Sequence, residues 1–496
     1  MRLELHFSLF LTYTLFLSNG LASAAPNSLP LAHSKKGLVH TTALKALKSR
    51  TGFGFERRRV VSASAVYKQH IDKAAGRLGR ALEERVVDSG AYAYRQYDKR
   101  LNRSGIPLGL VKTASGTTKD SPSKDREAGH SGLGDLIAAV DPPCSDPVEC
   151  GVHSAELENE LTDIGYFCEA FFGTPPRRFK LLVDTGSADL WVPGENCHGD
   201  DQSAPGCGPH ASIGHNSSSS FRDTRDGFFI VYGSGYVLGL MATDHLSIAD
   251  LTVENVRFGA TEKESRSVIS ANIPWDGILG LAQPDLARQP NGTQFIDALM
   301  NTSQINEPVT SFKIPRHLDA EKEGSEGEMT IGGTNPEKYH EDTVVTMKNV
   351  NNNKGFWEAP IDGLSVNGVA VEWFTNNRSG VLDTGTSLLV VPPSDARVIH
   401  SLIPGAQYDG KFKHWTVPCT ANTSMSIGFG GASFRIDPRD LVFDVPINKT
   451  TCYSGIAEGD LDIGKTVWLV GDTILKNVYL SLNRLKDEIS MAKLKE

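Results

Sequence analysis

Short runs rich in Val, Ile, Phe and Thr dominate the chain from about residue 152 onward. Gly, Asn and Pro separate these runs, which is the pattern of β-strands joined by tight turns. The clearest predicted strands are RRFKLLVDTG, GFFIVYGSG, LTVENVRFG, GEMTIGG, GVAVEWF and SFRID. Helical periodicity is convincing only near residues 295–300 and 394–403. The pattern therefore predicts an all-β body with a few short helices.

One acidic turn occurs twice behind an aliphatic run, as VDTGSAD at 183–189 and LDTGTSL at 382–388. Farther along the chain, each turn is followed by two consecutive aliphatic residues and then Gly, in DGILGLA at 276–282 and VWLVGDT at 467–473. Average amino-acid usage would place Asp-Thr-Gly twice in roughly one chain in two hundred of this length. We therefore expect two similar β lobes, each of which supplies one loop to a shared cleft.

The repeated turn carries residue types suited to acid–base chemistry. Asp provides a carboxylate, Thr a hydroxyl that locks the loop, and Gly a position that tolerates tight turning. Two facing loops would bring Asp184 and Asp383 within hydrogen-bonding reach, where both carboxylates cannot easily ionise together. The ionised carboxylate can then take a proton from water while the protonated one donates to a substrate carbonyl. This chemistry hydrolyses a peptide bond with no metal and no cofactor.

The N-terminal residues have the features of a secretory signal peptide. FSLFLTYTLFL at 7–17 is an apolar run preceded by Arg2 and followed by ASA at 22–24. The run is too short to span a bilayer comfortably, and no other apolar stretch approaches transmembrane length. We therefore expect a secreted, extracellular product with no membrane association, and the vacuole is the alternative destination.

Charge divides the remaining chain into two unlike parts. Residues 26–130 carry 21 Lys and Arg against 9 Asp and Glu, whereas residues 131–496 carry 28 against 49. A basic arm can bind nucleic acid, but a secretory signal argues against that partner. The other interpretation is a propeptide that docks on the acidic body at neutral pH and is released when the body's carboxylates become protonated.

These patterns divide the chain into five expected segments. Lys99-Arg100 is a candidate processing site at the end of the propeptide, and Arg57-Arg58-Arg59 is a competing one. The residues that follow are rich in Ser, Thr and Gly, as a flexible linker would be. The segments are a signal peptide at 1–24, a basic propeptide at 25–100, a linker or N-terminal extension at 101–150, an N-terminal catalytic lobe at 151–335 and a C-terminal catalytic lobe at 336–496.

Seven cysteines in a chain that enters the secretory pathway are expected to be largely oxidised. Cys197 and Cys207 bracket a short polar loop, and Cys419 and Cys452 flank a strand-rich stretch, so we expect these two disulfides. The sequence leaves open the pairing of Cys144, Cys150 and Cys168. Seven Asn-x-Ser/Thr sites fit a secreted glycoprotein.

Taken in order, the motifs resemble those of the pepsin-type (family A1) aspartic endopeptidases, in particular those secreted by fungi. The resemblance covers about residues 157–492. It rests on FGTPPRRFKLLVDTGSADLWVP for the first active-site loop, VYGSG for the flap hairpin, GVLDTGTSLLVVP for the second loop, and DGILGLA and WLVGDTILKNVYLSL for the strands behind the loops. It implies a bilobal pepsin-like acid protease fold of two similar β-barrel-like lobes with a central cleft, made as a zymogen.

The resemblance also implies roles for individual residues. Asp184 and Asp383 would be the catalytic pair, with the neighbouring threonines bonded across the lobes beneath them. The supporting residues of the two loops would be Thr185, Gly186, Ser187, Thr384, Gly385 and Thr386. The hydroxyls of Ser187 and Thr386 would bond the outer carboxylate oxygens. The flap and substrate-binding residues would be Tyr232, Gly233, Ser234, Ile269, Trp275 and Ile278.

The expected partners are protein or peptide substrates, the chain's own propeptide as an intramolecular inhibitor, and pepstatin-type inhibitors, with the protein itself a monomer. Ser234 stands where some fungal relatives have an Asp linked to acceptance of basic side chains, so we expect large hydrophobic residues on both sides of the scissile bond. A vacuolar processing protease is one alternative. A non-catalytic binding protein of the same fold is another, but such relatives usually lose a catalytic Asp or the Gly beside it, and both loops are intact here.

Overall fold

The computed structural model describes residues 151–159, 163–200, 206–232, 235–266, 268–269, 273–350, 354–371, 378–411, 413–459 and 465–495. The expected signal peptide, propeptide and linker, together with Cys144, Cys150, Gly233 and Ser234, lie outside the described residues. No described helix is both long and apolar enough to cross a membrane.

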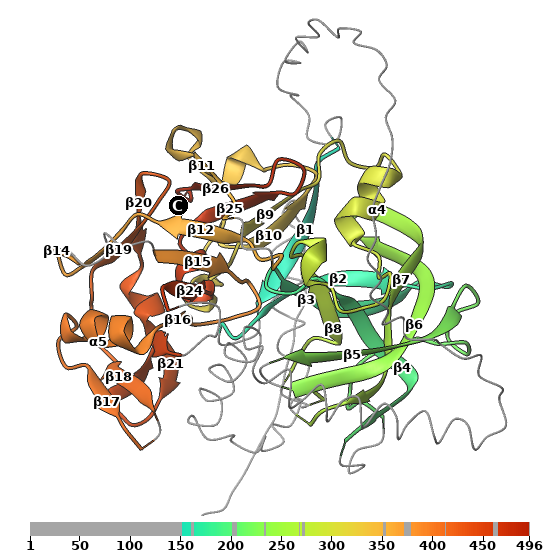
Figure 1. Ribbon diagram of the computed structural model, residues 1–496, viewed down its shortest axis with the longest axis horizontal. Helices are drawn as coiled ribbons and strands as arrows, with labels where there is room; N and C mark the ends of the chain where they lie inside the picture. The colour runs from blue at the N-terminus through green and yellow to red at the C-terminus, as the bar shows by residue number, and fades with distance from the viewer. Residues whose placement is uncertain are drawn as a thin grey trace, which may run out of the picture. The chain divides into compact units, whose positions relative to one another are not determined.

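Strands account for most of the regular structure, as the sequence pattern predicts (Figure 1). The strands up to residue 331 are β1 His153–Asn159, β2 Tyr166–Phe172, β3 Arg177–Asp184, β4 Leu190–Gly199, β5 Arg222–Tyr232, β6 Gly235–Ile248, β7 Leu251–Glu264, β8 Gly277–Gly280, β9 Val309–Lys313 and β10 Gly327–Ile331. The later strands are β11 Val345–Lys348, β12 Glu358–Ile361, β13 Gly363–Val366, β14 Val369–Ala370, β15 Arg378–Leu382, β16 Leu389–Val391, β17 Gln407–Asp409, β18 His414–Pro418, β19 Met425–Phe429, β20 Ala432–Ile436, β21 Val442–Pro446, β22 Thr451–Ser454, β23 Ile456–Glu458, β24 Val467–Val470, β25 Tyr479–Asn483 and β26 Glu488–Ala492.

The helices of the described residues are few and short. Within these residues the α-helices are α4 Phe295–Asn301, α5 Pro393–Ser401 and α6 Asp472–Leu475, and the 3-10 turns are η1 Pro284–Leu286, η2 His317–Asp319, η3 Pro336–Lys338, η4 Glu341–Thr343 and η6 Pro438–Leu441. Helices α4 and α5 confirm the two segments with helical periodicity. Strands β3, β5, β7, β10 and β20 confirm five of the predicted strands. The sixth, GVAVEWF, contains the exposed strand β14 at Val369–Ala370, which pairs with β13, and its last three residues lie outside the described residues.

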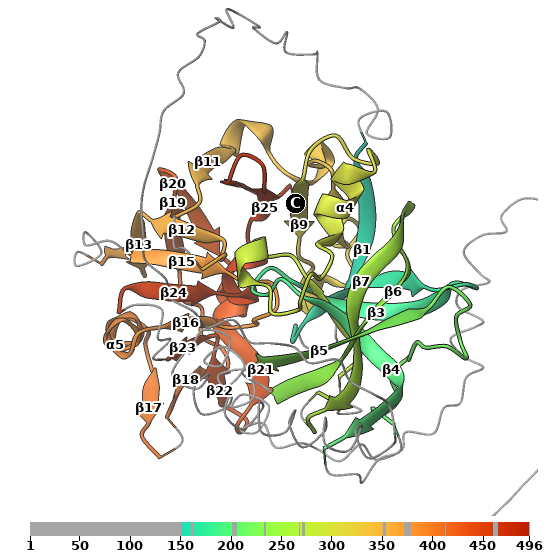
Figure 2. The same ribbon diagram turned by 45° about the vertical axis from the view of Figure 1, so that its right-hand side comes forward.

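Two groups of strands form the lobes (Figures 1 and 2). In the first lobe, β2–β3–β8–β4–β7–β6 pair in that order, and β6 pairs back to β2, so the sheet closes into a barrel. The second lobe contains a five-stranded sheet, β12–β15–β24–β16–β23, and two four-stranded sheets, β14–β13–β19–β20 and β17–β18–β22–β21. The inner faces of these sheets carry the hydrophobic core, which includes fully buried Trp191, Trp357 and Trp468.

The repeat that the sequence indicates is visible in the strand pairing. In the first lobe, β8 lies between β3 and β4, parallel to β3 and antiparallel to β4. In the second lobe, β24 lies between β15 and β16 with the same two directions. Each Asp-Thr-Gly turn thus joins two strands that are separated by a third, and the aliphatic motifs DGILGLA and VWLVGDT supply that third strand.

A further sheet joins residues from both ends of the described chain. Its order is β11–β26–β25–β9–β10–β1, and β1 continues the pairing into β2 of the first lobe. Strand β25 pairs with β9 antiparallel, and the hydroxyl of Ser311 donates to that of Ser481 at 2.9 Å within this sheet. Backbone pairing therefore connects the two lobes independently of the Asp-Thr-Gly turns.

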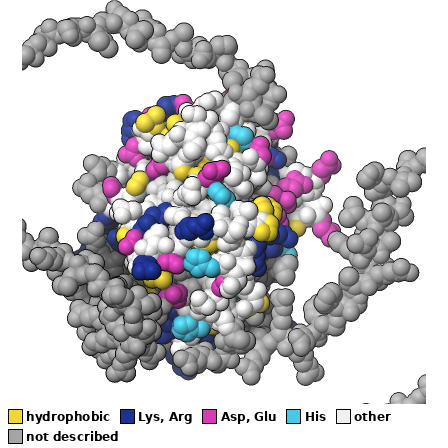
Figure 3. Space-filling view, turned by 90° about the vertical axis from the view of Figure 1, so that its right-hand side faces the viewer, with side chains coloured by type: hydrophobic (Ala, Val, Ile, Leu, Met, Phe, Trp, Pro, Cys, Tyr) yellow, Lys and Arg dark blue, Asp and Glu magenta, His cyan; other side chains and the backbone are white. Residues whose placement is uncertain are grey.

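One face of the molecule, drawn in Figure 3, has charged side chains of both signs interspersed with uncharged surface. The hydrophobic side chains visible on the described part of this face are scattered rather than gathered into one patch. Such scattered apolar residues are usual on a protein surface and mark no docking site by themselves.

A buried carboxylic acid lies at the end of β7, next to the hairpin that β5 and β6 form. Glu264 is fully buried, its Oε1 accepts a hydrogen bond from Thr261 Oγ1 at 2.6 Å, and its Oε2 has no partner among the described residues. Burial raises the pKa of Glu264 to about 7, against smaller opposing effects of the Thr261 hydrogen bond and of nearby His210. The folded state therefore binds a proton here that the unfolded chain releases at lower pH.

The Glu264→Gln variant tests this protonation. Because the pKa is higher in the folded state, the stabilisation is complete below the unfolded pKa of 4.5 and is lost as pH rises through 7. Gln mimics the neutral acid, so the variant should match the wild type at pH 4 and exceed it by roughly 3 kcal/mol near pH 7. Urea unfolding at both pH values measures the difference. Glu254→Gln, an exposed position on the same strand, is the control, and a pH-independent difference for Glu264→Gln would contradict the assignment.

Candidate active site

The two Asp-Thr-Gly turns lie at equivalent places in the repeat. Strand β3 ends at Asp184, and Asp383 directly follows β15. Both strands are buried along their last residues, which accounts for the continuous aliphatic runs that precede the turns. Both aspartates are fully buried as well. Each turn therefore presents a carboxylate from the end of a rigid central strand.

The two carboxylates accept matching sets of hydrogen bonds. Asp184 Oδ1 accepts from the backbone N–H of Gly186 at 2.9 Å, and Oδ2 accepts from Ser187 Oγ at 2.6 Å. Asp383 Oδ1 accepts from Gly385 N–H at 2.9 Å, and Oδ2 accepts from Thr386 Oγ1 at 2.6 Å. The hydroxyls of Ser187 and Thr386 thus bond Oδ2 of the two carboxylates at equal distances. Thr386 is buried and Ser187 is partly exposed, so the two sites differ in solvent contact.

Thr185 and Thr384 join the two turns through a reciprocal set of hydrogen bonds. Thr185 Oγ1 accepts from Thr384 N–H at 3.0 Å and donates to Leu382 O at 2.8 Å. Thr384 Oγ1 accepts from Thr185 N–H at 3.1 Å and donates to Val183 O at 2.9 Å. All four bonds are buried. Each threonine therefore satisfies the backbone of the opposite turn and fixes the distance between the turns.

Gly186 packs closely against the opposite turn. A Cβ on Gly186 would lie 2.5 Å from both Cγ and Oδ1 of Asp383, closer than nonbonded atoms can come. The Asp383 carboxylate thus lies against Gly186, whose N–H is bonded to Asp184. The two carboxylates are on either side of one glycine, which places two acidic groups in a single buried site.

The strands behind the turns require glycine for the same steric reason. A Cβ on Gly280, the last residue of β8, would lie 2.4 Å from the backbone N of Asp189. A Cβ on Gly471, directly after β24, would lie 2.1 Å from Thr386 O. The residue after each of these glycines forms a backbone hydrogen bond to the adjacent turn. Leu281 N–H donates to Asp184 O at 2.8 Å, and Asp472 N–H donates to Thr386 O at 2.8 Å.

Trp357 connects the two turns by a second route that the sequence does not reveal. Its indole N–H donates to Leu281 O at 3.0 Å, and its own carbonyl accepts from Leu382 N–H at 2.8 Å. Leu281 follows β8 of the first lobe, and Leu382 ends β15 of the second. Trp357 belongs to no periodic pattern, so only the three-dimensional contacts identify it.

Tyr232 lies at the end of β5, where the hairpin with β6 turns. Its hydroxyl accepts a hydrogen bond from Trp191 Nε1 at 2.7 Å, and both side chains are buried. Trp275 and Ile278 pack in the same apolar cluster as this pair. Three of the expected flap and substrate-binding residues, Tyr232, Trp275 and Ile278, thus pack together.

Ile269 lies apart from that cluster and packs against the disulfide between Cys197 and Cys207. Both expected disulfides are present, since Cys419 also bonds Cys452. Cys168 is buried and forms no disulfide with any described cysteine, and burial raises the pKa of its thiol to about 12.

One group of side chains has ligand atoms close enough to hold a metal ion. Within the described residues, the sulfurs of Cys197 and Cys207 and a carboxylate oxygen of Glu264 lie within 4.8 Å of one another. The two sulfurs are bonded to each other, and it is the thiolate that binds metals. The group therefore does not act as a metal site while the disulfide is intact.

Asp189, in the first repeated turn, holds a neighbouring segment in place. It is buried and accepts hydrogen bonds from the backbone N–H groups of Arg288 and Gln289 at 2.9–3.0 Å. Burial raises the pKa of Asp189 to about 6, although these bonds oppose the shift. The side chain of Gln289 returns a bond to Leu190 O at 2.8 Å. Asp189 is thus a structural anchor beside the site.

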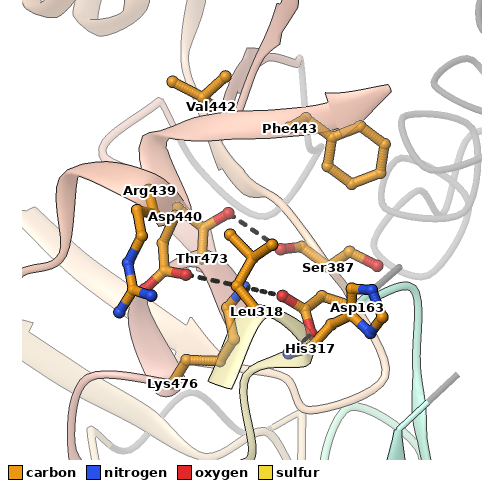
Figure 4. Close-up of a pocket in the computed structure, with 10 residues that line it drawn as sticks. All are labelled: Asp163, His317, Leu318, Ser387, Arg439, Asp440, Val442, Phe443, Thr473 and Lys476. Carbon is orange, nitrogen blue, oxygen red and sulfur yellow. Dashed lines mark hydrogen bonds and ion pairs between the residues drawn. The ribbon is translucent and has the colours of Figure 1, made fainter. Parts of the chain in front are cut away.

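A small polar cavity of about 30 Å³ borders the second turn (Figure 4). Ser387 lines it from that turn, and the Ser387 hydroxyl donates to Ile164 O at 2.7 Å. On the opposite wall Lys476 Nζ bonds Asp163 at 2.8 Å and Asp440 at 3.0 Å. Burial alone would lower the pKa of Lys476, but Asp440 and Asp163 raise it above its ordinary value. An ion network therefore adjoins the turn through residues 163–164.

Comparison with known proteins agrees with this geometry. The family model described as eukaryotic aspartyl protease matches residues 165–494, well over half of the chain. The aspartic-type endopeptidase ctsD of Aspergillus fumigatus is 32% identical over 327 residues, which cover 66% of this chain and 65% of that protein. The chain therefore belongs to the eukaryotic aspartyl protease family.

Other relatives come from fungi and mammals. Cathepsin E of Mus musculus is 29% identical over 353 residues, which cover 69% of this chain and 84% of that protein. A probable vacuolar protease A of Trichophyton verrucosum is 29% identical, covering 69% and 82%. The match spans less than two thirds of the A. fumigatus protein and 62% of a probable aspartic-type endopeptidase CTSD of Arthroderma benhamiae.

The Thr185→Val variant tests how far the two turns depend on each other. Without the hydroxyl, Leu382 O loses its donor and Thr384 N–H loses its acceptor, both in a buried site. The free energy of unfolding should fall by roughly 2 to 5 kcal/mol, measured by urea denaturation at acid pH. Thr346→Val is the control, because its hydroxyl bonds Ser490 on the surface; its effect should stay within about 0.5 kcal/mol. Equal effects of the two substitutions would contradict the prediction.

Proposed function

We propose that this chain is an aspartic endopeptidase that hydrolyses peptide bonds at acidic pH, with Asp184 and Asp383 as its catalytic pair. The observation that carries the proposal is the matched bonding of two buried carboxylates on either side of Gly186. Membership of the aspartyl protease family supports the same activity.

The proposed mechanism follows from the proximity of two acids. Ionising one carboxylate disfavours ionisation of the other, so the pair holds one proton over a range of acidic pH and titrates as a unit. The ionised carboxylate accepts a proton from water as the water attacks the peptide carbonyl. The protonated carboxylate donates to the carbonyl oxygen, which becomes a hydroxyl of the tetrahedral intermediate. Proton transfer to the amine nitrogen then permits the C–N bond to break.

The bonds around the pair supply preorganisation. Each carboxylate is held by one glycine N–H and one hydroxyl, and the threonine network keeps the two turns at a constant separation. These groups need no rearrangement when charge moves between the acids, which is the main electrostatic requirement for this type of catalysis. Thr185, Thr384, Ser187 and Thr386 therefore act as positioning residues.

The apolar cluster around Tyr232 supports a preference for large hydrophobic residues beside the scissile bond. Trp191, Trp275 and Ile278 pack with Tyr232 near the turn end of the β5–β6 hairpin. The hydrogen bond from Trp191 on β4 fixes the orientation of the Tyr232 phenol, and the hairpin would cover a bound peptide. Gly233 and Ser234, which lie outside the described residues, belong to the proposed flap by their position in the sequence.

We further propose that the protein is made as a secreted zymogen and acts as a monomer on protein and peptide substrates. The basic segment 25–100 would inhibit the acidic body by charge attraction at neutral pH and dissociate when the pH falls. A vacuolar destination is the alternative, and the similarity to a protein named as a probable vacuolar protease keeps it open.

The catalytic proposal predicts the effect of removing either acid. Asp184→Asn and Asp383→Asn should each lower kcat/KM by at least about a thousandfold, because each carboxylate has a separate proton-transfer task. The assay is cleavage of casein at acid pH by the processed protein, with and without pepstatin. Asp226→Asn, an exposed acid paired with Arg257, should keep full activity. Activity that persists in either dyad variant, or that pepstatin fails to inhibit, would overturn the mechanism.

The substrate proposal predicts the cleavage pattern in a peptide library. Sites with large hydrophobic residues on both sides should dominate, because large apolar side chains, Trp275 and Ile278 among them, pack around Tyr232. The measurement is mass-spectrometric mapping of cleavage sites at acid pH. Strong cleavage after Lys would contradict the preference while leaving the acid–base mechanism intact.

A further inference from the structure

A second cavity, of about 570 Å³, lies beyond the ion network that borders the active-site turn. Strand β20 and the segments around residues 437, 476 and 493 line it. Arg316 and Lys476 face this cavity, and Lys476 also lines the small cavity beside Ser387. The two cavities thus share a wall of ion-paired side chains.

The charge of this larger cavity is opposite to that of the protein body. Arg316, Arg435, Lys476 and Lys493 line it, and Asp437 is the one acid among the lining residues. Residues 131–496 as a whole carry 28 basic against 49 acidic side chains. A concentration of positive charge on an acidic body attracts anions and raises their local concentration.

Two of the four cationic side chains form ion pairs with acidic residues. Arg316 bonds Asp440 through Nε and Nη2, and Lys476 bonds Asp163 and Asp440. Asp437 is bonded by Arg439. Arg435 and Lys493 are exposed, and neither forms an ion pair with another described residue. Two positive charges therefore face the cavity without neutralisation from the described part of the chain.

We propose that this cavity binds an oxyanion group, a carboxylate, sulfate or phosphate, held between Arg435 and Lys493. The guanidinium fork pairs with two oxygens of such a group, and an ammonium supplies a compact point charge. The exposed hydroxyl of Ser433 provides a further donor at the same wall. The cavity volume lies within the range of small-molecule sites, so it accommodates the anionic group together with the molecule that carries it.

A ligand in this cavity would also contact the ion network that adjoins the active-site turn. Lys476 connects the cavity to Asp163, and the next residue, Ile164, accepts the Ser387 hydroxyl bond through its carbonyl. An anion that draws Arg316 or Lys476 toward itself weakens their bonds to Asp440 and Asp163. The site is therefore placed to influence the turn that carries Asp383.

Sulfate is the probe for this site, because it stays a dianion at the acid pH at which Arg and Lys are charged. The full chain is titrated with sulfate at constant ionic strength against chloride, and the melting temperature is followed at pH 5. Site binding gives a saturable rise in stability, whereas the general effect of sulfate on protein surfaces grows steadily with concentration. The readout does not depend on peptidase activity, so it succeeds or fails independently of the proposed function.

The Arg435→Gln/Lys493→Gln variant should lower the apparent sulfate affinity at least about tenfold. The charge-matched control is Arg225→Gln/Lys449→Gln, which removes two exposed cations that do not line the cavity and should keep the saturable response. Citrate should compete with sulfate for the wild-type protein. A response without saturation, an equal response of both double variants, or a lack of competition would overturn the proposal.

Discussion

The exchange of hydrogen bonds between Thr185 and Thr384 is the constraint on which the rest of the site depends. Each hydroxyl both accepts from and donates to the backbone of the opposite turn, so neither turn has its bonds satisfied without the other. Leaving such buried groups unpaired costs free energy, so the distance between the two lobes at this point resists change. These hydrogen bonds set the spacing of the two carboxylates. Trp357 also connects the two lobes, through its hydrogen bonds to Leu281 and Leu382.

Much of the site could be predicted because its information is local. Asp-Thr-Gly, its preceding strand and the glycine of the third strand each occupy a few consecutive residues, and repetition reveals that two copies act together. The disulfide pairs followed from loop context in the same way. The partly buried pair of Lys476 and Asp163 could not be predicted, because the residues are 313 positions apart and neither lies in a periodic pattern. Ile269 illustrates the converse, since the resemblance implies a flap or substrate-binding role for it, whereas its side chain packs against the Cys197–Cys207 disulfide.

Some buried ionisable groups stabilise the fold more at low pH, and others stabilise it more at high pH. Burial raises the pKa of Glu264 to about 7 and of Asp189 to about 6, so both stabilise the fold below their unfolded pKa values and lose that effect as pH rises. Burial lowers the pKa of His400 to about 4, so the stabilisation from its neutral ring is complete above 6.5 and is lost as pH falls. The two acids lie in the first lobe and the histidine in the second. Acidity therefore acts on these two acids and on this histidine in opposite directions.

The sheet that joins β9 to β25 also has a consequence for synthesis. Ser311 and Ser481, bonded across these strands, are 170 residues apart in the chain. At the usual rate of translation, β9 waits roughly 10 to 30 seconds for its partner to be made. During that interval one edge of β9 has unpaired backbone groups, which is the kind of surface that pairs with other chains. The nascent protein is thus most exposed to wrong association after its first lobe can form but before its final strands emerge from the ribosome.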